Sequence, residues 1–217
     1  MGRGTFWKPG TGCGLGLALL AAACGGGGGS TPTSPSPAPA AATYRGATTD
    51  ATGDALTGFG VRTAPDLTEA TLDAANGTLT IRVRFAPGTF DRAALSTQIL
   101  MDTDQATASG LPGIGASGPD GGIIGPDWLL NVEPTESYLL DCRALRQGAC
   151  APGPSVGTTT FVSDGFDVAV SLATLADDGK LAFKVLVGGI SGAGRTATYT
   201  DDLDVMPDVG RSAARVE

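Results

Sequence analysis

The feature that most constrains the fold is an alternating strand that follows an Asn-Gly turn. Residues Thr78–Phe85 read TLTIRVRF, so every second side chain is apolar. This period of two is typical of an antiparallel strand with one buried face and one solvated face. Asn76 and Gly77 separate it from the run Thr68–Ala74, and both tolerate the positive φ angles of a tight turn. The pattern predicts a β-hairpin.

More short strands, separated by turn residues, follow along the chain. We expect them at Ser137–Cys142, Thr158–Ser163, Phe166–Leu172, Leu181–Val187 and Thr196–Leu203, with single helical turns at Asp91–Leu95 and Ala173–Ala176, and loops at Arg143–Ala149 and Gly188–Gly194. Many short strands with few helical patterns predict an all-β fold, an antiparallel β-sandwich. We expect one domain over residues 44–210 and a frayed tail over 211–217.

The N-terminal segment has the pattern of an export signal. Residues 1–23 combine the positive charges of Arg3 and Lys8 with a short apolar run, and Cys24 follows small residues. The segment resembles a lipoprotein-type signal peptide, which implies that Cys24 carries the lipid; Ala21 stands where the usual pattern has Leu. An ordinary signal peptide cleaved nearby is the alternative. Residues 24–43 are rich in Gly, Ser and Pro and predict a disordered tether.

The absence of histidine and the net charge exclude several classes of function. The sequence contains no histidine, which excludes Ser-His-Asp and Cys-His catalysis and His-ligated metal sites. The formal net charge is −8, so we expect no nucleic-acid partner, because an acidic surface repels phosphates.

Two cysteines lie within the expected domain. Cys142 and Cys150 are close in sequence, and an exported chain meets oxidising conditions, so we predict a local disulfide. Two thiolates without a third ligand or a histidine do not complete a zinc site.

The stretch from Thr97 to Val132 carries the candidate metal ligands. Asp102 and Asp104 lie on the same side of a strand end, and Asp127 begins the next apolar run after a long Gly-rich loop. Carboxylates and loop carbonyls are the oxygen ligands that Ca²⁺ prefers. Two interpretations stay open: a calcium site at Asp102, Asp104 and Asp127, or a solvated strand end whose carboxylates accept hydrogen bonds from loop amides.

Two further acidic groups and one tryptophan are also candidates for a functional site. Asp201, Asp202 and Asp204 form a second acidic group, either a surface strand end or the second half of the same site, and Asp50 and Asp54 form a third. Trp128 is a candidate ligand-binding residue, which either stacks on a ligand or packs in the core.

The motifs taken together resemble a known group of exported bacterial domains. In order they are the N-terminal hairpin, ILMDTDQATASG, GPDWLLNV, FDVAVSLATLADDGKLAFKVLVGG and TDDLDVMPDVG, and they cover most of residues 53–210. This order resembles family 9 carbohydrate-binding modules and DOMON-like domains. The resemblance implies a jelly-roll-like sandwich, in some members with structural calcium, bound sugar or haem. The chain has few aromatic residues for a sugar platform, and haem ligands are scarce.

These observations predict a lipid-anchored β-sandwich of the cell envelope that acts as a non-catalytic binding or structural module stabilised by calcium. Its expected partners are the membrane, through the N-terminal lipid, and a glycan or an envelope protein. The alternative is a carbohydrate-binding accessory or a glycan-processing protein. No catalytic residue is assigned.

Overall fold

The computed structural model describes residues 43–55, 64–106, 109–111, 124–146, 149–176, 179–191, 198–207 and 213–216. They all belong to one compact unit, Pro39–Glu217. The expected signal peptide and Cys24 lie outside the described residues, as does the expected tether except for Thr43. Among the residues described, no helix has the length and apolar character needed to cross a membrane.

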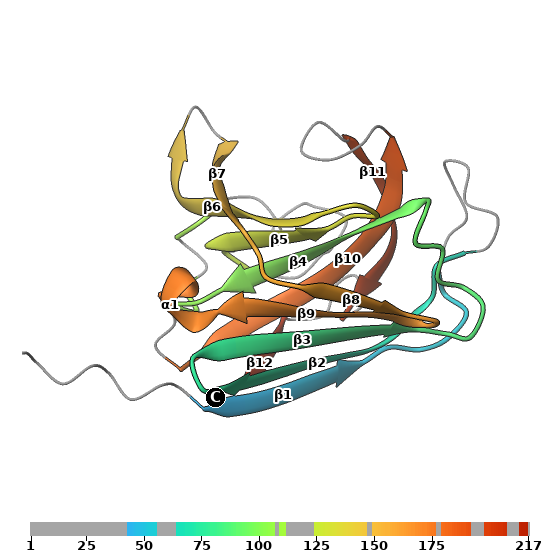
Figure 1. Cartoon of the computed structure of the whole chain (residues 1–217), viewed down its shortest axis with the longest axis horizontal. Coiled ribbons are helices and arrows are strands. Elements are labelled where there is room, and N and C mark those ends of the chain that lie inside the picture. The colour runs from blue at the N-terminus through green and yellow to red at the C-terminus, as the bar shows by residue number, and fades with distance from the viewer. Residues whose placement is uncertain are drawn as a thin grey trace, which may run out of the picture. The chain divides into compact units, whose positions relative to one another are not determined.

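The described part of the chain forms two antiparallel sheets (Figure 1). The first sheet has the order β1 (Tyr44–Thr49), β2 (Leu67–Ala75), β3 (Thr78–Phe85), β9 (Gly165–Ser171) and β8 (Thr159–Val162). The second has the order β11 (Thr198–Met206), β10 (Leu181–Ser191), β4 (Leu95–Asp102), β5 (Trp128–Val132), β6 (Ser137–Arg146) and β7 (Ala149–Ser155), and β12 (Ala214–Val216) also pairs with β10. The predicted all-β sandwich is confirmed.

The connections between the sheets are of the jelly-roll-like kind. The chain changes sheet between β3 and β4, between β7 and β8, and between β9 and β10. As a result β3 lies beside β9, and β4 lies beside β10, although these pairs are far apart in sequence. Such long-range neighbours are typical of Greek-key sandwiches.

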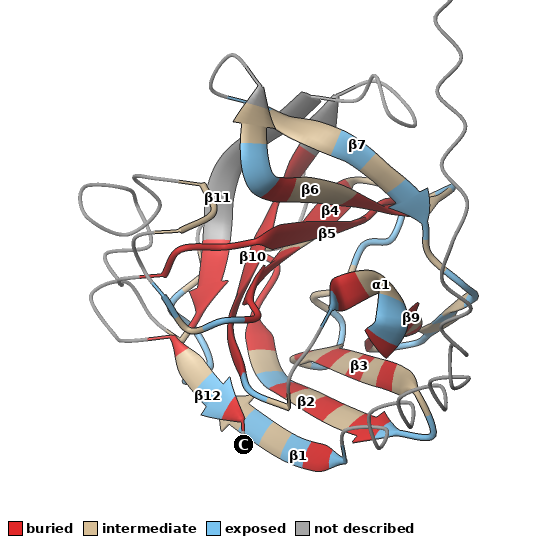
Figure 2. Ribbon diagram, turned by 90° about the vertical axis from the view of Figure 1, so that its left-hand side faces the viewer, coloured by how far each residue is buried: buried red, intermediate tan, exposed pale blue. Residues whose placement is uncertain are grey.

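The predicted hairpin is present, and its turn has the expected backbone conformation. Asn76 and Gly77 both adopt positive φ, 52° and 76°, which gives a turn whose twist matches that of the flanking strands. β3 alternates as expected, with Leu79, Ile81 and Val83 fully buried. These side chains belong to the main core, and the alternation of buried and intermediate residues along β3 is visible in Figure 2.

The second sheet is buried on both faces in its centre, because a second apolar cluster covers its outer side. β4 and β5 are buried almost throughout, as Figure 2 shows. The cluster includes Leu100 and Leu129 from the sheet and Ile124 from the loop before β5. Leu111, from the same loop, packs against it and donates a hydrogen bond to the carbonyl of Pro126 (3.0 Å). The described ends of this long loop therefore cover part of the sheet.

Three expectations about local structure were wrong. β6 and β7 form a hairpin across residues that we expected as a loop. β10 continues through Gly188 and Gly189 to Ser191, with register shifts at these two glycines, because glycine permits the bulge that keeps the strand paired. The expected frayed tail contains β12, which pairs with β10 from Leu181 to Phe183.

The expected turn at Asp91 is present as a hydrogen-bonded turn in which Ala94 and Leu95 donate to the Asp91 carbonyl.

Candidate metal centre

The structure brings Asp102, Asp104 and Asp127 together at one end of the second sheet. Each offers a carboxylate oxygen, and the three oxygens lie within 4.8 Å of one another. Asp102 ends β4, and Asp127 directly precedes β5, its antiparallel neighbour. The backbone N–H of Asp127 donates to the carbonyl of Met101 (2.8 Å), which extends the pairing to the point where the carboxylates meet.

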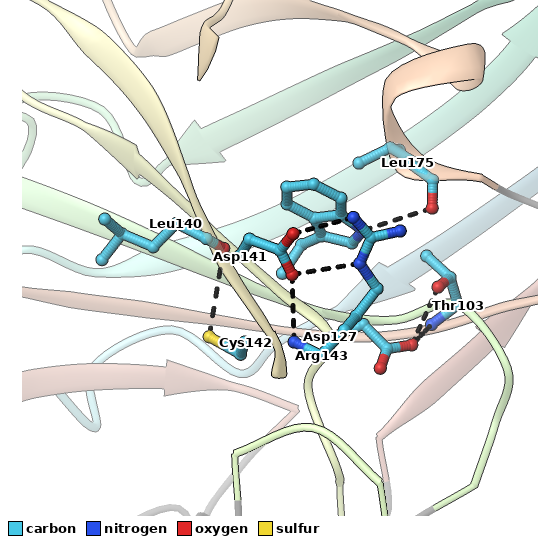
Figure 3. A network of polar contacts seen from close by, with 8 residues as sticks. Thr103, Asp127, Leu140, Asp141, Cys142, Arg143 and Leu175 are labelled. Atoms are coloured by element: carbon cyan, nitrogen blue, oxygen red, sulfur yellow. Dashed lines mark hydrogen bonds and ion pairs between the residues drawn. The ribbon is translucent and has the colours of Figure 1, made fainter. Parts of the chain in front are cut away.

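Two of these carboxylates are held in place by the loop that begins at Thr103. One oxygen of Asp127, Oδ2, accepts hydrogen bonds from the backbone N–H (3.0 Å) and the hydroxyl (2.8 Å) of Thr103, as Figure 3 shows. Asp104 Oδ1 accepts from the N–H of Ala106 (2.8 Å) and from the hydroxyl of Ser109 (3.0 Å). Asp104 and Asp127 thus organise the loop and hold their oxygens at the site.

Asp102 differs from both, because its carboxylate is buried while one of its oxygens accepts no hydrogen bond from the described residues. Its side chain is 1% exposed, and its Oδ1 has no hydrogen-bond partner among the described residues. Burial raises the pKa of Asp102 to about 6; the side chain and charge of Asp104 and the charge of Asp127 add to this effect, whereas a backbone hydrogen bond from Gly125 opposes it. The ionised form of Asp102 is therefore unfavourable at this position unless a cation compensates its charge.

This arrangement can hold a metal ion. Oxygens that share one cation at 2.3–2.6 Å lie at most about 5 Å apart, so the separation of at most 4.8 Å fits a shared ion. The donor set consists of carboxylates, with neither thiolate nor imidazole, which favours a hard cation.

Trp128 packs in the core. Its side chain is 2% exposed, and its indole N–H donates to the carbonyl of Leu175 (3.2 Å). The guanidinium of Arg143 lies 4.3 Å from the ring centroid and is held by Asp141, with hydrogen bonds of 3.0 and 2.7 Å (Figure 3). This burial supports the core interpretation of Trp128 over a stacking platform.

The disulfide between Cys142 and Cys150 is confirmed. It joins β6 to β7, whose Cα atoms at these positions are 4.3 Å apart. β7 is the edge strand of the second sheet, and two of its residues, Pro152 and Pro154, have no N–H to donate to the pairing with β6. The covalent bond holds this edge in place.

A second acidic cluster combines Asp204 and Asp54, which the sequence analysis placed in two separate acidic groups, with Asp66, which it did not single out. Asp54, Asp66 and Asp204 also bring carboxylate oxygens within 4.8 Å of one another. Asp204 is therefore not the second half of the Asp102 site, and it is buried, with 8% of its side chain exposed. Nothing local marks Asp66 as its neighbour, since only the packing of the two sheets brings them together.

A polar pocket of about 320 Å³ lies where β7 leads into β8. Its wall includes Arg92, Glu136, Ser155, Thr159 and Phe161. The Arg92 guanidinium lies 3.8 Å from the centroid of the Phe161 ring and donates two hydrogen bonds to the carbonyl of Pro134. One face of the aromatic ring is therefore occupied by a fixed cation.

No protein-family model matches this sequence, and the search of curated proteins gives no significant match. The resemblance to carbohydrate-binding and DOMON-like domains therefore stays an expectation.

Proposed function

We propose that this chain is an exported, lipid-anchored domain of the cell envelope, a non-catalytic binding or structural module whose sandwich is stabilised by calcium. The observation that carries the proposal is the buried Asp102, whose Oδ1 lacks a hydrogen-bond partner among the described residues and which lies beside Asp104 and Asp127. A buried carboxylate without compensation destabilises a fold, and a cation removes that penalty.

Calcium is the ion that this donor set suits best. Ca²⁺ accepts carboxylates together with backbone carbonyls and water in a flexible geometry, whereas Mg²⁺ demands a nearly ideal octahedron. Here the carboxylates come from a strand end and from a loop, and Asp104 is exposed, which leaves room for water ligands.

Calcium titration of metal-free protein tests this part of the proposal. Native mass spectrometry and calorimetry should show calcium binding, and Asp102→Asn should bind one ion fewer per chain. Saturation at 100 times Kd stabilises by about 2.7 kcal/mol, which corresponds to roughly 5–10 °C in Tm for a domain of this size. Glu69→Gln, an exposed change in β2, is the matched control. An unchanged number of bound ions in Asp102→Asn contradicts the proposal.

The lipid anchor has its own test. The support is the apolar segment before Cys24 and the Gly/Pro-rich segment after it. Cys24→Ser should move the protein from the membrane fraction to the soluble fraction. The control is Cys13→Ser, a change within the expected signal peptide of residues 1–23, which should leave the distribution of the protein unchanged. Membrane association that survives Cys24→Ser would argue against lipidation.

A second candidate function is glycan binding, which the pocket beside β8 favours. Hydroxyl, carboxylate and guanidinium groups line it together with Phe161, the mixture of polar and aromatic groups that sugar sites use. Because Arg92 covers one face of Phe161, only a weak aromatic platform is available. A glycan screen should find a ligand whose binding Phe161→Ala abolishes; an empty screen favours the structural role.

A further inference from the structure

The cluster of Asp54, Asp66 and Asp204 joins three segments that are distant in sequence. Asp54 follows β1, Asp66 directly precedes β2, and Asp204 lies in β11 of the other sheet. Asp204 pairs with Val187, a residue of the main core, so its side chain is directed to the interior side of its sheet. The cluster therefore lies where the edges of the two sheets meet.

The carboxylates are fixed by backbone donors. Asp204 accepts from the N–H of Leu67 through Oδ2 (2.6 Å) and from that of Val205 through Oδ1 (2.9 Å). Asp66 Oδ2 accepts from the N–H of Gly53 (2.9 Å). These bonds position the oxygens before any ligand arrives, which reduces the entropic cost of binding.

Asp66 supplies the observation that points to a ligand. Its side chain is 7% exposed, and its Oδ1 is buried without a hydrogen-bond partner among the described residues. Asp204 is buried beside it, and neither residue forms an ion pair within the described part of the chain. Two buried carboxylates in contact with a third repel one another unless a proton or a cation intervenes.

We propose that Asp54, Asp66 and Asp204 form a second site for a divalent cation, with Ca²⁺ as the preferred ion, which ties the edges of the two sheets together. The donors are again hard oxygens, with neither a cysteine nor a histidine among them. Asp54 is exposed and provides the route of entry. An ion here cross-links β11 to the segments that flank β1 and β2.

This site is independent of the one at Asp102. Asp102 pairs with Ala182, and Asp204 pairs with Val187, so the two sites are five residues apart along β10, or roughly 16 Å at the usual strand rise. They also lie on opposite faces, because Ala182 belongs to the outer apolar cluster and Val187 to the main core. Ligands of one site cannot substitute for those of the other.

The test counts calcium ions bound to the full chain after EDTA treatment and dialysis. With CaCl₂ as the probe, native mass spectrometry should show two ions for wild type and for the control Glu69→Gln, and one each for Asp66→Asn and Asp102→Asn. The double variant, Asp66→Asn with Asp102→Asn, should bind no calcium ion. Calorimetry of Asp54→Asn should show one site weakened at least tenfold, and this exposed change keeps the test valid if Asp66→Asn fails to fold.

The outcomes separate this site from the proposed calcium site at Asp102. If Asp102→Asn binds no calcium, or if Asp54→Asn binds as many ions as wild type with equal affinity, the second site is refuted. If wild type binds one ion that Asp54→Asn weakens and Asp102→Asn leaves intact, the second site stands and the Asp102 site fails.

Discussion

Asp204 in β11 accepts a hydrogen bond of 2.6 Å from the backbone N–H of Leu67, the first residue of β2 in the other sheet. Asp127 acts in a similar way at the other site, where its carboxylate holds Thr103 after the end of β4. Both carboxylates thus accept hydrogen bonds from backbone N–H groups at the start or just after the end of a strand, at the cost of burying negative charge close to other acids. The stability of the sandwich should therefore depend on protons and cations.

Arg143→Ala should expose the Trp128 ring. The guanidinium lies over the indole and is half-exposed, so its removal should cost about 0.5–1 kcal/mol. In a Trp7→Phe background, which leaves Trp128 as the single tryptophan, the fluorescence maximum should shift to longer wavelength. Arg45→Ala, an exposed change in β1, should leave the spectrum unchanged. An identical spectrum in Arg143→Ala would show that the cation does not shield the ring.

Reduction of the disulfide should loosen β7. Cys142 and Cys150 are separated by 8 positions, and a loop of this size corresponds to about 2–3 kcal/mol in the chain-entropy account. We expect a reductant to lower Tm by roughly 5–10 °C. The double variant Cys142→Ala with Cys150→Ala should have the lower Tm with and without reductant. A reductant effect in that variant would point to another cause.

Gly77→Val should destabilise the β2–β3 hairpin. Gly77 has φ 76°, a conformation that costs a residue with a Cβ about 1–2 kcal/mol and more when the side chain is β-branched. Chemical denaturation should show this loss as a lower midpoint with an unchanged slope. Asn76→Gly is the control, because glycine adopts its φ of 52° without strain. Equal midpoints for both variants would contradict the role of this turn.

The parts of the fold that the sequence predicts are those encoded by neighbouring residues. Alternation in Thr78–Phe85 and the Asn76-Gly77 turn define a hairpin locally, and the disulfide joins adjacent strands. Asp102 and Asp127 converge for the same reason, since they end one strand and precede its neighbour.

The parts that could not be predicted depend on contacts between distant segments. Lys184 stands on the face of β10 that alternation assigns to solvent, yet it is fully buried because other segments cover that face. The cluster of Asp54, Asp66 and Asp204 exists only because β11 packs near the start of β2. Periodicity describes which faces of a strand differ, but it contains no information on which segment covers them.

Metal-free protein should become less stable as the pH rises from about 4 to 7. Burial raises the pKa of both Asp102 and Asp204 from 3.8 to about 6, so between these values the folded state binds more protons than the unfolded state. The stabilisation from these protons is complete below pH 4 and is lost as the pH rises through 6. Asp141, whose pKa is lowered by Arg143, acts in the opposite direction only at lower pH.

The measurement is Tm by circular dichroism from pH 4.5 to 7.5 on EDTA-treated, dialysed protein. Tm should fall by several degrees across this range in wild type and by less in Asp102→Asn, which has one buried acid fewer. Added calcium should restore Tm at pH 7.5 and have little effect at pH 4.5, because protons then occupy the carboxylates. A metal-free Tm that rises between pH 5 and 7 would show that the two buried acids do not govern the stability of the domain.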